Sequence, residues 1–112
     1  PQYLSPRNRT PDRMRLLEAM GLRLGNEAFL QQTMALTIRK AAFDLLPRIN
    51  CPTLVLAGND DIVCPLDRHE EIGDAIPGAD LTILKDCGHI STLEQPESVT
   101  DALRQLLRRP SV

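Results

Sequence analysis

Three side chains that can handle protons follow two short apolar segments of this 112-residue chain. Asp60 and Asp61 come directly after the apolar run 52–57, and His89 follows the apolar run 80–84. A carboxylate that accepts a hydrogen bond from an imidazole fixes its tautomer and stabilises its charged form, so the ring can act as general base and acid. These residue types predict an acid–base pair. The competing interpretation is that the aspartates are ordinary turn residues and the histidine is an ordinary loop residue.

The two apolar runs have the composition of neighbouring strands in a parallel sheet. Residues 52–57 are apolar at successive positions, as in a strand that is buried on both faces. Pro65 begins a predicted helix over 66–76, and strand–helix–strand order implies a parallel pair with a crossover connection. Functional groups gather beyond the carboxyl ends of such strands, so we expect an aspartate to reach His89 there.

The first 46 residues have helical spacing instead. Thr10-Pro11-Asp12 predicts a helix start, and a glycine at 21 or 25 can end that helix. A second, longer helix with a wide apolar stripe is expected from Asn26 to Leu46, where Pro47 stops it. The expected fold class is α/β: a helical hairpin followed by β-α-β-α, with a last helix that begins at Pro96 and two parallel strands.

Composition excludes several classes of function. The net charge is −2, with one Tyr, two Phe and no Trp, so neither nucleic acid nor an anionic membrane is an expected partner. No apolar stretch approaches the roughly 20 residues that span a bilayer, and no signal peptide is recognisable. The three cysteines are irregularly spaced, as is typical of reduced thiols, which predicts a cytoplasmic protein.

Residues 49–107 resemble the C-terminal part of the α/β-hydrolase superfamily. The resemblance is carried by INCPTLVLAGNDDIVCP, then IPGADLTILKDCGHISTLEQPESV, then ALRQLL. Its linked motifs are Gly-x-x-Asp with Pro four residues on, Ile-Pro-Gly-Ala, Gly-His and Glu-x-Pro-Glu. The segment GNEAFLQQTMALTIRKAAF is similar to the end of the helical cap of such enzymes. The resemblance therefore implies a cap-derived segment over 1-47 and a C-terminal core segment over 48-112.

The resemblance also implies the site residues. The acid of the superfamily falls on Asp61, four residues before Pro65, and the base falls on His89 of the Gly-His motif. Asp60 is then a turn residue or a helper. Glu94 is expected to act on backbone amides at a helix start rather than on substrate. No cofactor is implied, and the expected partner is a small-molecule substrate of the full-length enzyme.

The nucleophile of the superfamily lies on a Gly-x-Ser-x-Gly turn, and no serine of this chain has that context. We therefore expect a segment of a serine-type hydrolase of ester or related acyl or carbon–carbon bonds, in which the chain alone is inactive or nearly so. The serines are Ser5, Ser91, Ser98 and Ser111.

Other interpretations of the residues remain. Cys64, Cys87 and His89 could form a zinc site, with His69 or an aspartate as fourth ligand, although semi-buried thiols are the simpler interpretation. A noncatalytic assembly module with the same fold is the alternative function. With either function, an uncovered edge of the strand at 53–57, or the helical hairpin, predicts that this chain forms a homo-oligomer.

Overall fold

The structure is a computed structural model that describes residues 2–109, so Ser111 lies outside the described residues. Its strands and helices follow the order that the sequence predicts, with short 3-10 helices (η1, η2) and a one-turn helix (α3) added. In chain order the elements are η1 Pro6–Asn8, α1 Pro11–Ile38, η2 Phe43–Arg48, β1 Leu54–Gly58, α2 Leu66–Ala75, β2 Asp80–Leu84, α3 Ser91–Glu94 and α4 Pro96–Leu107.

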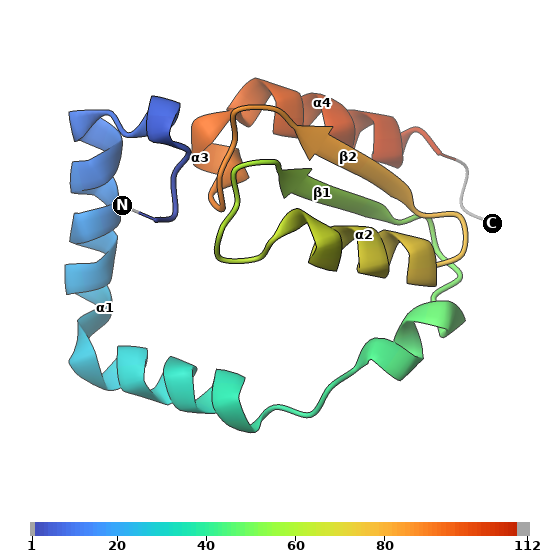
Figure 1. The fold of residues 1–112 in the computed structure, drawn as a ribbon, viewed down its shortest axis with the longest axis horizontal. Helices are drawn as coiled ribbons and strands as arrows, with labels where there is room; N and C mark the ends of the chain where they lie inside the picture. The colour runs from blue at the N-terminus through green and yellow to red at the C-terminus, as the bar shows by residue number, and fades with distance from the viewer. Residues whose placement is uncertain (1, 110–112) are drawn as a thin grey trace.

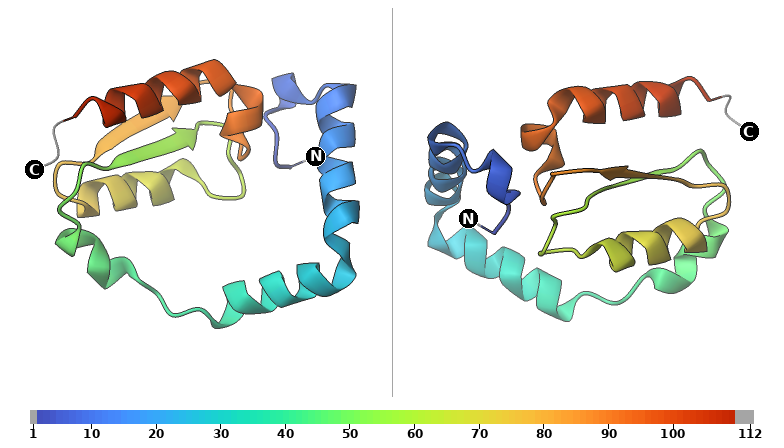
Figure 2. Two further views of the ribbon diagram at one scale, coloured as in Figure 1. Left: turned by 180° about the vertical axis from the view of Figure 1, so that it is seen from behind. Right: turned by 45° about the horizontal axis from the view of Figure 1, so that its top comes forward.

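β1 and β2 form a parallel two-stranded sheet, which confirms the predicted pair. The register runs from Leu54 opposite Asp80 to Gly58 opposite Leu84. α2 lies on one face of the sheet and α4 on the other (Figure 2). The buried apolar side chains of these layers are Val55, Ala57, Ile76, Leu84, Cys87, Val99 and Ala102.

The loops that follow the two strands are in contact. The loop before His89 passes directly over the backbone of Gly58, the last residue of β1. A Cβ atom on Gly58 would lie 2.2 Å from the carbonyl oxygen of Cys87, so only glycine fits there. The N–H of Asn59 donates to the carbonyl of Leu84 at 3.0 Å, and that of Asp60 donates to the carbonyl of Cys87 at 2.8 Å. These bonds extend the pairing of the strands beyond their carboxyl ends.

The helical region differs from its prediction in two ways. α1 bends at Gly25, whose φ of 77° breaks the helix at one of the two predicted positions, but its two arms diverge instead of folding back on each other (Figure 1). The predicted helix end at Leu46 was wrong, since α1 ends at Ile38 and Pro47 lies inside η2. η2 packs against α2, and this tertiary contact overrides the helical propensity of residues 39–46.

The apolar stripe of α1 is largely exposed. Phe29, Leu30, Met34 and Ile38 of the second arm are between 59% and 76% exposed. The spacing of these residues is that of an amphipathic helix, but no layer of the described chain covers them. Over the same described residues, no helix combines the length and the hydropathy that a bilayer crossing requires.

Candidate active site

Asp61 and His89 meet at the carboxyl end of the sheet. The imidazole Nδ1 of His89 lies 2.9 Å from Oδ2 of Asp61. Asp61 comes three residues after the end of β1, and His89 comes five residues after the end of β2, so the parallel register places both loops on one edge. The aspartate side chain is 4% exposed, whereas the imidazole is 31% exposed. The carboxylate is therefore held inside the protein while part of the ring faces outward.

The second oxygen of Asp61 is also bonded. Oδ1 accepts the backbone N–H groups of Val63 and Cys64, each at 2.9 Å. Burial by itself would raise the pKa of Asp61, but the N–H of Cys64, the hydrogen bond and charge of His89 and the N–H of Val63 together lower the pKa below its usual 3.8. The carboxylate therefore stays ionised at neutral pH and is oriented towards the ring.

The histidine is held by its backbone as well as by its ring. Its N–H donates to the carbonyl of Tyr3 at 2.8 Å, and the tyrosine ring lies beside the imidazole with centroids 5.8 Å apart. Because the ionised Asp61 only accepts, Nδ1 of the neutral ring carries the hydrogen and Nε2 carries the lone pair. Nε2 has no hydrogen-bond partner among residues 2–109. A hydroxyl placed at Nε2 could transfer its proton to the ring.

Glu94 is a buried carboxylate that holds the loop before His89. It is 5% exposed and accepts the backbone N–H of Gly88, with 2.8 Å to the nearer oxygen, and that of Ser5, with 3.2 Å. The amide of Asn8 donates to it at 3.0 Å. The sequence correctly predicts a role on backbone amides, but not at a helix start: one amide belongs to the preceding loop and the other to Ser5, 89 residues earlier in the chain. Glu94 thereby fastens the segment before α1 to the loop of the histidine.

Asp60 acts on the same N-terminal segment and not on His89. Its Oδ2 accepts the hydroxyl of Ser5 at 2.6 Å. Ser5 is fully buried and its hydroxyl is engaged there, so it has no access to a substrate. Sequence reasoning missed Ser5 and Tyr3 because no local pattern links them to partners that lie 55 to 89 residues away.

The three cysteines are free thiols that differ in their exposure. Burial, followed by the charges of Glu94, Asp60 and Asp61, raises the pKa of Cys87 to about 11, so its sulfur is a neutral thiol at pH 7. Cys51 and Cys64 are exposed. Within the described residues, no three His, Cys, Asp or Glu side chains are grouped as metal ligands would be. His69 is a partly exposed residue of α2, and its Nδ1 lies 3.3 Å from the carbonyl oxygen of Pro65.

Known proteins share this fold and this segment. The family described as TAP-like protein matches residues 36–112. RutD of Stutzerimonas stutzeri (strain A1501), named as a candidate carbamate hydrolase, is 38% identical over 65 residues, or 55% of this chain and 24% of that protein. The chain spans about a quarter of the length of the curated relatives that it matches.

Two solved structures extend the likeness to three dimensions. A thermophilic esterase from Thermogutta terrifontis is 42% identical with a TM-score of 0.61, over 63% of this chain and 26% of the esterase. Est816, described as an N-acyl homoserine lactone degrading enzyme, is 28% identical with a TM-score of 0.76, over 93% of this chain and 43% of that enzyme. The chain therefore belongs to the TAP-like protein family of the α/β-hydrolase superfamily.

Proposed function

We propose that this chain supplies the acid and the base of a serine-type hydrolase that cleaves an ester or a related acyl or carbon–carbon bond. The observation that carries the proposal is the 2.9 Å contact between His89 Nδ1 and Asp61 Oδ2, with Nε2 left for a hydroxyl. The hydrolase relatives support the class of reaction. The nucleophile then lies on a part of the enzyme outside these 112 residues, and residues 1–47 belong to its cap.

The proposed chemistry uses the ring twice. Nε2 takes the proton of the serine hydroxyl as the serine oxygen attacks the substrate carbonyl, and the imidazolium that forms is stabilised by the ionised Asp61. The ring then returns this proton to the leaving group. A water molecule, deprotonated by the same Nε2, then attacks the acyl-enzyme, and the imidazolium returns this proton to the serine oxygen as the bond to the acid product breaks.

The isolated chain is proposed to be inactive or nearly so, because the members of such a relay act as a unit. Hydrolysis of p-nitrophenyl acetate by the purified chain tests this directly, with His89→Ala as the control for background reaction. An enzyme-like rate that disappears in His89→Ala would contradict the proposed inactivity.

The hydrolase itself is tested on the full gene product, whose intact mass also shows whether a longer protein is made. Asp61→Asn and His89→Ala should each lower kcat by about 10³-fold or more while leaving the far-UV circular dichroism unchanged. Glu70→Gln on the exposed face of α2 is a matched control and should keep full activity. Activity that survives His89→Ala would exclude the proposed base.

The second candidate function is a noncatalytic assembly module. It is favoured by the exposed apolar side chains of the second arm of α1, which would suit an interface. A Gly-x-Ser-x-Gly motif about a hundred residues before Pro1 in the gene would favour the hydrolase instead.

A further inference from the structure

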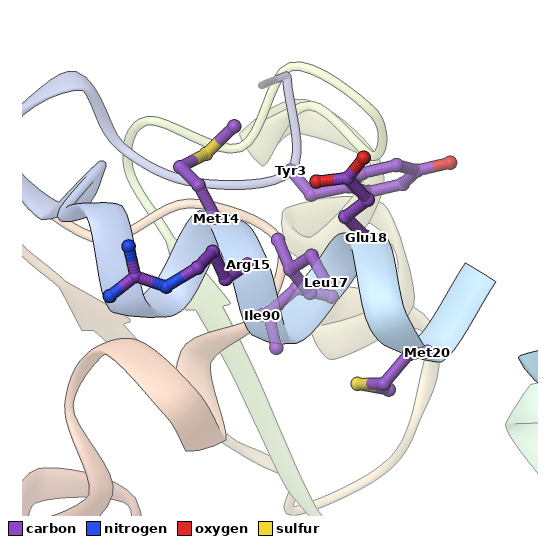
Figure 3. A pocket seen from close by; sticks show the side chains of 7 residues that line it. All are labelled: Tyr3, Met14, Arg15, Leu17, Glu18, Met20 and Ile90. Atoms are coloured by element: carbon purple, nitrogen blue, oxygen red, sulfur yellow. The ribbon is translucent and has the colours of Figure 1, made fainter. Parts of the chain in front are cut away.

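A cavity of about 570 Å³ lies between the first arm of α1 and the loop of the histidine. Its wall is mostly apolar, with the two methionines at different ends of the opening (Figure 3). A volume of this size suits a small organic molecule, and apolar lining favours an alkyl or aryl group. The lining residues are Tyr3, Met14, Arg15, Leu17, Glu18, Met20 and Ile90.

The cavity adjoins the proposed base. Ile90 directly follows His89, and the ring of Tyr3 lies 5.8 Å from the imidazole, centroid to centroid. The carbonyl of Tyr3 accepts the N–H groups of both His89 and Ile90, at 2.8 and 3.3 Å, so this wall is attached to the loop that carries the base. A group bound in the cavity is therefore held beside the ring.

The two charged residues of the lining are not equivalent. The guanidinium of Arg15 is paired with the carboxylate of Asp12 one turn earlier, and its side chain points away from Tyr3 (Figure 3). The carboxylate of Glu18 lies on the tyrosine side of the cavity and has no ion-pair partner among residues 2–109. The charge left uncompensated at this apolar surface is negative.

We propose that this cavity receives an apolar part of the substrate and that Glu18 selects against substrates that carry an additional anionic group there. A carboxylate at the end of the bound chain would face the exposed carboxylate of Glu18 beside the apolar wall and be weakly repelled, whereas a neutral or cationic end would not be repelled. The role in substrate choice rests on the proposed hydrolase function, but the binding preference does not, because it requires no reaction.

The test is binding of three six-carbon probes to the full chain at neutral pH: hexan-1-ol, hexylamine and hexanoate. Methyl-13C labelling of methionine reports on both ends of the cavity through Met14 and Met20, while exposed Met34 on the other arm serves as an internal reference. Hexanol and hexylamine should shift the first two methyl signals and leave the third in place. Hexanoate should bind about two- to fivefold more weakly than hexylamine, the range of an exposed charge pair.

Two variants separate Glu18 from general charge. Glu18→Gln should reduce the difference between hexylamine and hexanoate to near unity, and Glu27→Gln, which removes the same charge beyond the bend of α1, should leave the difference unchanged. Raising the ionic strength from about 0.01 M to about 1 M should also reduce the difference in the wild-type chain, because salt screens exposed charges.

Three results would overturn the inference: equal binding of hexanoate and hexylamine to the wild type, a difference that survives Glu18→Gln, or methyl shifts that include Met34 equally. If Glu18→Gln does not fold, the salt dependence of the wild-type chain decides. None of the probes has a bond to cleave, so these results are independent of catalysis. Loss of hydrolysis with intact selectivity would contradict the proposed function alone.

Discussion

The two regions of the molecule are held in place by different forces. In the α/β region, buried side chains from the sheet, α2 and α4 share one core, and buried carboxylates bind backbone amides of other loops. In the helical region, α1 and η2 contain no buried residue, and the large apolar side chains of the second arm face outward. Substitutions should therefore lower the free energy of unfolding strongly in the α/β region, where atoms are already in contact, and only slightly in the helical region.

The largest effect is expected at Gly58. In Gly58→Ala the new Cβ would lie 2.2 Å from the carbonyl oxygen of Cys87, which is backbone and cannot rotate away. We expect a loss of about 3 kcal/mol or more in the free energy of unfolding, measured by urea denaturation. A loss under 1 kcal/mol would mean that the two loops are not packed against each other as described.

Glu94→Gln should have the next largest effect. Each of the N–H groups of Gly88 and Ser5 lies near both carboxylate oxygens, so the glutamine keeps one oxygen that accepts while its NH2 group faces these same donors. The expected loss is about 2–3 kcal/mol in the free energy of unfolding. The proton resonance of His89 Nδ1–H should also broaden, because the loop that carries the ring is released.

Glu97→Gln is the matched control, since Glu97 is an exposed residue in the first turn of α4. It should leave both the stability and the Nδ1–H resonance within error of the wild type. Equal behaviour of the two variants would show that burial of Glu94 does not contribute to holding the histidine loop.

Asp61→Asn tests the electrostatics of the site. The pKa of Asp61 is lowered in the folded chain, so its ionisation stabilises the fold above pH 3.8, and this stabilisation is lost as the pH falls through the lower folded pKa. The wild type should exceed the variant by about 1–2 kcal/mol at pH 7. The difference should shrink as the pH falls below 3.8, measured by parallel urea unfolding of the two proteins. A difference independent of pH would exclude the charge as its cause.

Leu30→Glu tests whether the exposed arm of α1 is an interface. Leu30 is 61% exposed, and the sequence predicts a homo-oligomer through the helical region or the strand edge. If the arm is the contact, the substitution should weaken self-association about tenfold or more, as measured by light scattering across micromolar concentrations. Gln32→Glu adds the same charge on the same arm and is the control. A wild-type chain that is monomeric throughout would contradict the predicted assembly.

The smallest effect, with the opposite sign, is expected at Gly21. A Cβ added to this glycine in the first arm of α1 meets no atom within 4 Å. Gly21→Ala should therefore raise the free energy of unfolding by about 0.5–1 kcal/mol through helix propensity alone. Calorimetric unfolding of Gly21→Ala and Gly58→Ala measures the effect of the same added methyl group in the two regions. A destabilised Gly21→Ala would place a contact in the helical region that the structure does not show.

The sequence by itself determined the parallel strand pair, the helix between the strands and the edge at which Asp61 and His89 meet. Strand composition, turn residues and helix starts are local properties, and a parallel crossover leaves one arrangement for the loops that follow. Even the start of α4 at Pro96 and the bounds of β2 agree with the predicted positions.

Only the tertiary structure decided which partners the remaining polar groups have and where α1 ends. Glu94 and Ser5 are 89 residues apart, and no spacing rule relates a carboxylate to an amide that far along the chain. The apolar stripe of α1 has the same pattern whether it is buried or exposed, and α1 ends at Ile38 although helical spacing continues to Leu46, where the chain instead forms η2 and packs on α2. Contacts between distant segments compete with local preference, and their outcome depends on which surfaces the fold brings together.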